Sequence, residues 1–142
     1  MDGWRACCTA RVLVALPAQV ARHRVLVIDD EPLVGRAVKR VLADQDVTCV
    51  TSAREALQLL REGPRFGVLL CDLMMPDMTG AEFRDAMLTV RPEMEQRLIF
   101  ITGGAFTPDM ERFLEESGCP HLLKPFDVPV LRGIVAARLG AA

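Results

Sequence analysis

The sequence lacks the features that usually mark membrane-spanning, nucleic-acid-binding and disulfide-bonded proteins. No apolar run among its 142 residues is long enough to cross a bilayer, so we expect no membrane insertion. A net charge of −2 leaves no basic surface for nucleic acid or for an acidic membrane. The five cysteines are odd in number and have no CxxC spacing. They disfavour a disulfide framework or a zinc site and indicate a reducing, cytoplasmic environment.

Glycine motifs for nucleotides, internal repeats and low-complexity segments are missing too. Neither GxGxxG nor GxxxxGK[ST] follows a candidate strand, which disfavours nucleotide binding. The apolar stretch Val12 to Leu16 is short and is interrupted by Pro17, so we do not expect a signal peptide. About half of the residues are hydrophobic and a quarter are charged, which is typical of one globular domain of this length.

Hydrophobic patterns predict a regular alternation of strands and helices. The apolar, β-branched run 24–28 is typical of a strand buried on both faces, and Pro32 suits the first position of a helix that reaches residue 42. Ser52 and Glu55 have the spacing of a capping box and predict a helix that ends at Gly63. Further strands are predicted at 47–50, 68–72, 98–101 and 121–123, and further helices at 80–90, 107–118 and 127–140.

This order predicts an α/β fold, a doubly wound parallel sheet of five strands with five helices on its two faces. Ligands of such sheets bind beyond the carboxyl ends of the strands. The predicted strands end there in Asp29–Asp30, Asp72, Thr102–Gly103–Gly104 and Lys124–Pro125. We therefore expect three carboxylates, a hydroxyl and an ammonium group to meet at one edge of the sheet.

Asp72 is the central residue of this set because it ends an apolar strand in the stretch GVLLCDLMMPDMTG. A buried carboxylate is costly unless it is paired, metal-bound or protonated. Three crowded aspartates favour Mg²⁺, with Mn²⁺ as the alternative, because Mg²⁺ binds through a few carboxylates together with phosphate oxygens. Lys124 would add positive charge beside a phosphate, and Thr102 would add a hydroxyl donor. The set predicts a phosphoryl-transfer site with Asp72 as the nucleophile.

Each motif also has a structural explanation when it is taken alone. The acidic run 29–31 can cap a helix, residues 102–104 can form a loop, and residues 124–126 can form a turn. Cys119 and His121 lie two residues apart and could provide a thiol nucleophile, but a proline separates them and no third group orients them. Only the joint occurrence of the acidic and basic residues at strand ends favours a site.

The motifs VLVIDDE, LLCDLMMPDMTG, IFITGG and LLKPF, in this order and spacing, resemble those of response-regulator receiver domains. These domains are the phosphorylatable half of bacterial two-component signalling. The resemblance covers about residues 24 to 139 and implies a flavodoxin-like receiver fold, with a receiver domain at 24–142 and an N-terminal extension or linker at 1–23. It also implies a Mg²⁺-dependent phosphoryl transfer from a histidine kinase or a phosphotransfer protein. Such a domain catalyses its own phosphorylation and dephosphorylation but is not a conventional enzyme.

The resemblance also implies roles for single residues. Asp72 would be the phosphoacceptor, and the proposed metal ligands are Asp29, Asp30, Asp72 and the backbone carbonyl of Met74. Thr102 would be the switch hydroxyl and Lys124 would contact the phosphate, with a cis Lys124–Pro125 bond. His121 lies where the family usually carries a phenylalanine or tyrosine switch residue. A downstream protein partner would bind the surface of the fourth helix, the fifth strand and the fifth helix.

Residue 74, the acidic set and the stretch before residue 25 bear on other functions and on a longer parent protein. A phosphohydrolase with an aspartyl-phosphate intermediate would need a second aspartate two residues after the nucleophile, where this chain has Met74. A degenerate receiver that serves only for docking would lack one of the acidic residues, and none is missing. The stretch CCTARVLVALPAQVARHR resembles the final strand and exit linker of a histidine-kinase ATP-binding domain. The chain would then be the C-terminal receiver of a hybrid histidine kinase, and we expect no output domain after Gly140.

Overall fold

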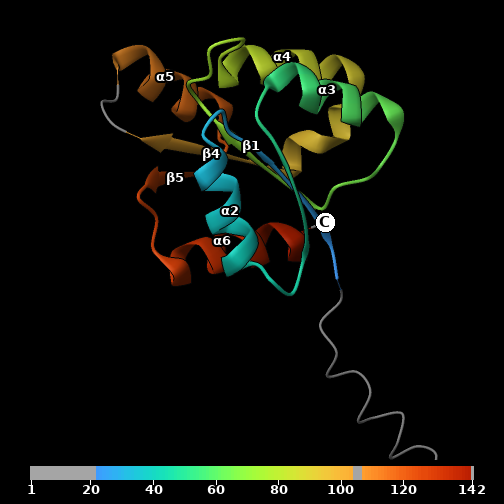
Figure 1. Cartoon of the computed structure of the whole chain (residues 1–142). Helices are drawn as coiled ribbons and strands as arrows, with labels where there is room; N and C mark the ends of the chain where they lie inside the picture. The colour runs from blue at the N-terminus through green and yellow to red at the C-terminus, as the bar shows by residue number, and fades with distance from the viewer. Residues whose placement is uncertain (1–21, 104–106, 142) are drawn as a thin grey trace, which may run out of the picture.

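Five parallel strands form a sheet with the order β2-β1-β3-β4-β5 (Figure 1). The computed structural model describes residues 22–103 and 107–141. Within this part of the chain the strands are β1 Arg24–Ile28, β2 Asp46–Val50, β3 Val68–Asp72, β4 Leu98–Gly103 and β5 His121–Lys124. Every neighbouring pair is parallel, so the carboxyl ends of the strands share one edge of the sheet.

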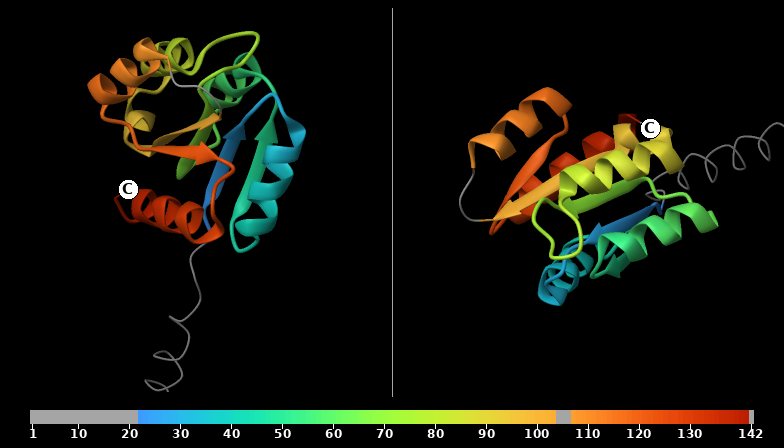
Figure 2. Two further views of the ribbon diagram at one scale, coloured as in Figure 1. Left: turned by 90° about the vertical axis from the view of Figure 1, so that its left-hand side faces the viewer. Right: turned by 90° about the horizontal axis from the view of Figure 1, so that it is seen from above.

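Helices cover both faces of the sheet (Figures 1 and 2). They are α2 Pro32–Val41, α3 Ala53–Glu62, α4 Gly80–Val90, α5 Pro108–Ser117 and α6 Val128–Ala141. Apolar residues of α2 and α6 pack in one buried cluster with one face of the sheet, and those of α3, α4 and α5 pack in a second cluster with the other face. The predicted doubly wound sheet with five helices on its faces is therefore confirmed for residues 22–103 and 107–141.

Polar side chains explain why α3, α4 and α5 begin where they do. Ser52 accepts a hydrogen bond from the backbone N–H of Glu55 at 3.0 Å, which is the first half of the predicted capping box. A complete capping box, which the sequence analysis did not identify, joins Thr79 and Glu82 at the start of α4. Thr107 caps α5 in the same manner as Ser52, since its hydroxyl accepts from the N–H of Met110.

Two strands extend further toward the functional edge than the sequence analysis predicted. β4 continues to Gly103 instead of Ile101, and β5 continues to Lys124. The register pairs Gly103 with Lys124, so both residues belong to the sheet and not to the loops that follow. A short 3₁₀ helix, η2 Pro92–Arg97, was also missed. Such helices are too short for a periodic apolar pattern to identify them.

The predicted domain boundary falls at the start of the described residues. Most of the predicted extension, residues 1–21, lies outside them. The backbone of His23 is already hydrogen-bonded to the domain, because its N–H donates to Gln45 Oε1 at 2.6 Å and its carbonyl accepts from the N–H of Asp46 at 2.9 Å. Within the part of the chain that the structure describes, no helix has both the length and the apolar character to span a membrane.

Candidate functional site

Three aspartates lie together at the carboxyl ends of β1 and β3, which are neighbouring strands. Asp29 and Asp30 follow β1, and Asp72 is the last residue of β3. One carboxylate oxygen of each aspartate lies within 4.8 Å of the others. Asp29 and Asp72 are buried, whereas Asp30 is exposed. The structure thus brings together the three carboxylates that the sequence predicts, with one side of the cluster open to solvent.

The backbone that follows each strand holds the two buried carboxylates in place. Asp29 Oδ1 accepts a hydrogen bond from the N–H of Glu31 at 2.9 Å. Asp72 Oδ1 accepts one from the N–H of Met74 at 3.1 Å. Each carboxylate therefore uses one oxygen to fix its orientation and turns the other, Oδ2, toward the remaining groups of the site.

Lys124 brings a positive charge to these oxygens from β5. Its Nζ lies 2.7 Å from Asp29 Oδ2 and 3.3 Å from Asp72 Oδ2. The side chain reaches them past Gly103, where an added Cβ would lie only 3.1 Å from Lys124 Cδ and 3.2 Å from its Cβ. This role of Gly103 could not be predicted from the sequence because it depends on the pairing of β4 with β5. The Lys124–Pro125 bond is cis, as predicted.

Thr102 supplies the hydroxyl group of the site. It belongs to β4, next to Ile101, which pairs with Asp72 across the sheet. Its side chain is 1% exposed, and its Oγ1 has no hydrogen-bond partner among residues 22–103 and 107–141. Leaving a buried hydroxyl unpaired is costly, so this oxygen is available to a polar group that enters beside Asp72.

A second glycine shapes the loop after Asp72. The N–H of Gly80 donates to the carbonyl of Leu73 at 2.8 Å, which closes the loop against the start of α4. An added Cβ at Gly80 would lie 2.9 Å from Leu73 Cα and 3.0 Å from the Phe100 ring. The glycine in the sequence stretch DMTG is compatible with this close contact, but its place before an amphipathic stretch predicts only a helix start.

His121 lies apart from the acidic cluster. His121 begins β5, three residues before Lys124, so the backbone of His121 lies about 10 Å from that of Lys124 along the strand. The residue is exposed and pairs in the sheet with Phe100. It also lines a pocket together with Glu111 and Glu115 of α5. The structure thus places His121 on the surface beside α5, and its role as a switch residue stays a prediction.

Burial and neighbouring charges perturb the acid–base properties of the site. Burial raises the pKa of Asp72 from 3.8 to about 6, and the charge of Asp29 adds to this effect, while the Met74 N–H and Lys124 oppose it. Burial lowers the pKa of Lys124, but its contacts with Asp29 and Asp72 outweigh burial and raise the pKa overall. At neutral pH most Asp72 side chains are therefore charged carboxylates, and Lys124 is an ammonium group.

These residues fit a magnesium ion. Mg²⁺ prefers oxygen ligands and binds through one or two carboxylates while it keeps several water molecules. Asp29, Asp30 and Asp72 offer such oxygens, and the exposed side at Asp30 leaves room for water. The crowding of like charges around a buried carboxylate gives a physical reason for a cation to bind.

The raised pKa of Asp72 predicts a pH-dependent gain in stability for Asp72→Asn. The pKa of Asp72 is higher in the folded protein than in the unfolded chain, so deprotonation of this carboxylate lowers the free energy of unfolding of the metal-free protein. This loss of stability is complete above about pH 6 and disappears as the pH falls toward 4. We expect Asp72→Asn to raise the melting temperature by about 5 °C near pH 8 and by less near pH 5. Thermal melts in EDTA measure this, with exposed Asp85→Asn as control. A gain that is equal at both pH values would contradict the assignment.

Comparisons with known proteins agree with the sequence resemblance. Residues 25–136 match the family described as response regulator receiver domain. Two-component response regulator ORR21 from Oryza sativa is 35% identical over 114 residues, which is 78% of this chain. Two-component response regulator ARR11 from Arabidopsis thaliana is 31% identical over 112 residues, or 77% of this chain. The chain spans only 16% and 21%, respectively, of the lengths of these two relatives.

Solved structures share the fold. The chemotaxis protein CheY4 from Vibrio cholerae has a TM-score of 0.71 at 26% identity, covering 82% of this chain and 98% of that one. The receiver domain of sensor histidine kinase PA1611 from Pseudomonas aeruginosa has a TM-score of 0.73 at 24% identity, covering 84% of this chain and 99% of that one. That structure has a magnesium ion coordinated in its active site cleft. These likenesses confirm the predicted receiver fold.

Proposed function

Because the chain belongs to the response regulator receiver domain family, we propose that it takes a phosphoryl group from a histidine kinase or a phosphotransfer protein onto Asp72. The observation that carries this proposal is the setting of Asp72. It is a buried carboxylate at a strand end, with one oxygen held by the Met74 N–H and the other facing Lys124 and two further aspartates. Simple structural roles, such as capping a helix, do not require this combination.

In the proposed reaction Asp72 Oδ2 attacks the phosphorus atom of a phosphohistidine. The P–N bond breaks as the new P–O bond forms, and the histidine nitrogen leaves with the electron pair and takes up a proton. The product is an aspartyl phosphate, a mixed anhydride that water can hydrolyse again. Only the deprotonated carboxylate can attack. With a pKa of about 6, most Asp72 side chains are charged at neutral pH.

We propose that Asp29, Asp30 and Asp72 hold Mg²⁺, with the backbone carbonyl of Met74 as a further ligand and Mn²⁺ as the alternative ion. The bound ion would neutralise negative charge on the phosphoryl oxygens. The chain's own contribution is to fix the ligands, since the N–H of Glu31 orients Asp29 and the N–H of Met74 orients Asp72. The oxygen-only donor set and the open side at Asp30 support this assignment.

Lys124 and Thr102 are proposed to recognise the transferred group. Lys124 Nζ already lies between Asp29 and Asp72, so a small movement would let it pair with a phosphoryl oxygen. The buried Thr102 hydroxyl would donate a hydrogen bond to another phosphoryl oxygen. A hydrogen bond to a charged group contributes roughly 1.5–3 kcal/mol. One such bond therefore biases a conformational equilibrium by roughly ten- to a hundredfold.

We propose that this shift of the conformational equilibrium changes the surface formed by α5, β5 and α6, where a partner protein binds. These elements are the fourth helix, fifth strand and fifth helix predicted from the sequence. Movement of Thr102 toward the phosphoryl group would open space that the His121 ring can enter. The change is a population shift between existing conformations and not a new fold. The exposed position of His121 at the start of β5, beside α5, supports a role at this surface.

Thr102→Ala is expected to separate phosphorylation from switching. The variant keeps Asp72 and Lys124 and should still take up a phosphoryl group, but it lacks the hydroxyl that moves. NMR shifts around His121 after addition of the phosphoryl mimic beryllofluoride should therefore change strongly in the parent and weakly in Thr102→Ala. Thr89→Ala, on the exposed side of α4, should respond like the parent. An undiminished response of Thr102→Ala would exclude Thr102 as the switch.

The setting of the domain in a larger protein is a separate proposal. The stretch CCTARVLVALPAQVARHR, residues 7–24, resembles the end of a histidine-kinase ATP-binding domain, so we propose a cytoplasmic protein in which this chain is the receiver of a hybrid histidine kinase. The alternatives are a receiver used only for docking and an aspartyl-phosphate phosphohydrolase. The complete acidic set argues against the first. Met74, at the position where the hydrolase needs an aspartate, argues against the second.

A small phosphodonor tests the proposed function without knowledge of the partner kinase. The full chain is incubated with acetyl phosphate, with Mg²⁺ or with EDTA, and its intact mass is measured. We expect the mass of one phosphoryl group to be added with Mg²⁺ and little addition in EDTA. A chain that gains no mass, or gains it equally in EDTA, would contradict the proposal. Phosphotransfer from purified histidine kinases would then identify the partner.

A further inference from the structure

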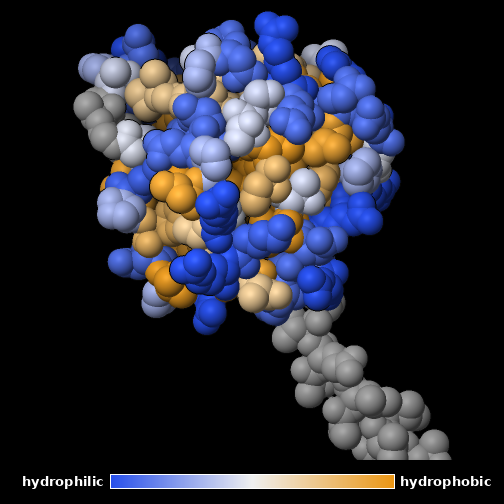
Figure 3. Space-filling model, viewed as in Figure 1, coloured by the Kyte–Doolittle hydropathy of each residue, from blue (hydrophilic) through white to orange (hydrophobic). Residues whose placement is uncertain are grey.

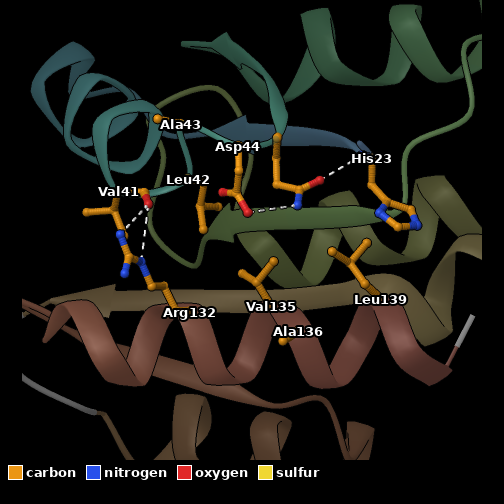
Figure 4. A pocket seen from close by; sticks show the side chains of 10 residues that line it. His23, Val41, Leu42, Ala43, Asp44, Arg132, Val135, Ala136 and Leu139 are labelled. Atoms are coloured by element: carbon orange, nitrogen blue, oxygen red, sulfur yellow. Dashed lines mark hydrogen bonds between the residues drawn. The ribbon is translucent and has the colours of Figure 1, made fainter. Parts of the chain in front are cut away.

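A groove lies between α2 and α6 at the edge of the sheet opposite the acidic site. Its volume is about 600 Å³. The apolar part of its lining comes from the end of α2, from the two residues that follow it and from α6 (Figure 4), and consists of Val41, Leu42, Ala43, Val135, Ala136 and Leu139. Apolar patches interrupt the hydrophilic surface over these two helices (Figure 3). This groove takes no part in the proposed phosphoryl transfer.

Polar contacts hold the walls of the groove in place. The Arg132 guanidinium, on α6, donates from Nε and from Nη2 to the carbonyl of Val41 at 3.4 Å, which ties the two helices together. Gln45 Nε2 donates to Asp44 Oδ2 at 3.4 Å at the other rim. These contacts are drawn in Figure 4. The groove is therefore bounded by fixed groups and carries a carboxylate, Asp44, at its rim.

The chain enters the domain at this groove. His23 lines it, and the backbone of His23 is fixed by hydrogen bonds to the Gln45 side chain and to the N–H of Asp46. The residues that precede His23 in the sequence therefore start at the mouth of the groove. The nearest strongly apolar stretch among them is Val12–Leu16, preceded by Arg11 and followed by Pro17.

Chain length allows this stretch to reach the whole groove. Six residues lie between Leu16 and His23, and the seven Cα–Cα steps that connect the two can span up to about 24 Å when extended. The α6 wall from Arg132 to Leu139 is only about 10 Å long. The effective concentration of a tethered segment is high, so even a weak apolar contact can be populated.

We infer that the groove between α2 and α6 binds the chain's own segment Val12–Leu16. The apolar side chains of the segment cover the exposed Ala136 and the half-buried Leu139, next to the buried Val135, and Arg11 lies near the carboxylate of Asp44. Because Asp72 lies at the opposite edge of the sheet, the bound segment leaves the acidic site accessible. The inference concerns the 142-residue chain and does not depend on the hybrid-kinase proposal.

Methyl NMR of the full chain tests this inference with paired variants. In the parent we expect nuclear Overhauser contacts between the methyl groups of Leu13 or Leu16 and those of Val135 or Leu139. Leu13→Asp should abolish these contacts, whereas Gln19→Asp, which places the same charge outside the apolar stretch, should keep them. On the groove side, Ala136→Glu should abolish them, and Ala137→Glu, an exposed neighbour that does not line the groove, should keep them.

Two results would overturn the inference. The first is the absence of these contacts in the parent, with Val135 and Leu139 methyl shifts that Leu13→Asp does not change. The second is a dependence of the parent's groove shifts on protein concentration, which would assign the groove to a second copy of the chain. Phosphorylation by acetyl phosphate should be the same in all five proteins, so a failure of the proposed function is recognised separately.

Discussion

Asp72→Asn is expected to abolish phosphoryl uptake from acetyl phosphate. The amide has nearly the shape of the carboxylate and can still accept the hydrogen bond from the Met74 N–H, but its oxygen is not a nucleophile of comparable strength. Intact-mass measurement of parent and variant with Mg²⁺ gives the result directly. We expect full addition for the parent and none for the variant at the same donor concentration.

A matched control separates loss of the nucleophile from loss of a negative charge. Asp85→Asn makes the same chemical change at an exposed position on α4, away from the strand ends, and should be phosphorylated like the parent. Thermal melts of both variants check that they are folded. A folded Asp72→Asn that still takes up one phosphoryl group would show that another residue is the acceptor.

Asp30→Ala is expected to weaken Mg²⁺ binding at least about tenfold, because loss of a direct ligand should cost no less than loss of a residue that supports a ligand. Asp30 is the best residue for this test. It is exposed, whereas Asp29 is buried and its carboxylate accepts a hydrogen bond from the N–H of Glu31. Mg²⁺ titrations followed by thermal melts measure the affinity, because an ion that binds the folded state raises the melting temperature.

Glu31→Gln is the control for this titration. It removes an exposed carboxylate one residue further along, outside the three-aspartate cluster, and should keep the parent's response to Mg²⁺. NMR shifts of the residues around Asp72 provide a second readout. If Asp30→Ala bound Mg²⁺ as tightly as the parent does, the assignment of this metal site would be wrong.

The sequence was sufficient to predict the sheet and the convergence of the aspartates. Apolar strands of a parallel sheet are short, continuous and β-branched, and their order along the chain alternates with helices that carry recognisable start and stop signals. Once the strands are parallel, their carboxyl ends share an edge, and Asp29, Asp30 and Asp72 must lie near one another. That inference needs no knowledge of side-chain packing.

Details that depend on register could not be predicted in this way. The pairing of Gly103 with Lys124 decides how the lysine reaches Asp29, and no local pattern encodes a pairing between strands that are far apart in sequence. The sequence predicts a contact of Lys124 with a phosphate, whereas the structure pairs Lys124 with Asp29 and Asp72. The two sets of contacts are compatible if Lys124 leaves the carboxylate oxygens of Asp29 and Asp72 and contacts phosphoryl oxygens during the reaction.

Short local features were missed for a different reason. The 3₁₀ helix Pro92–Arg97 is six residues long, and its one buried side chain, Met94, gives no periodic signal. The complete capping box at Thr79 and Glu82 follows Asp72 closely in the sequence, and that stretch was interpreted for its aspartates only.

Identification of the phosphorylated residue tests the central claim most directly. The full chain is phosphorylated with acetyl phosphate and Mg²⁺ and treated with borohydride, which reduces an aspartyl phosphate to homoserine, and the peptides are sequenced by tandem mass spectrometry. The account predicts homoserine at position 72 and unmodified aspartate at positions 29 and 30. Homoserine at position 29 or 30, or at no position in a protein that gained phosphoryl mass, would contradict it.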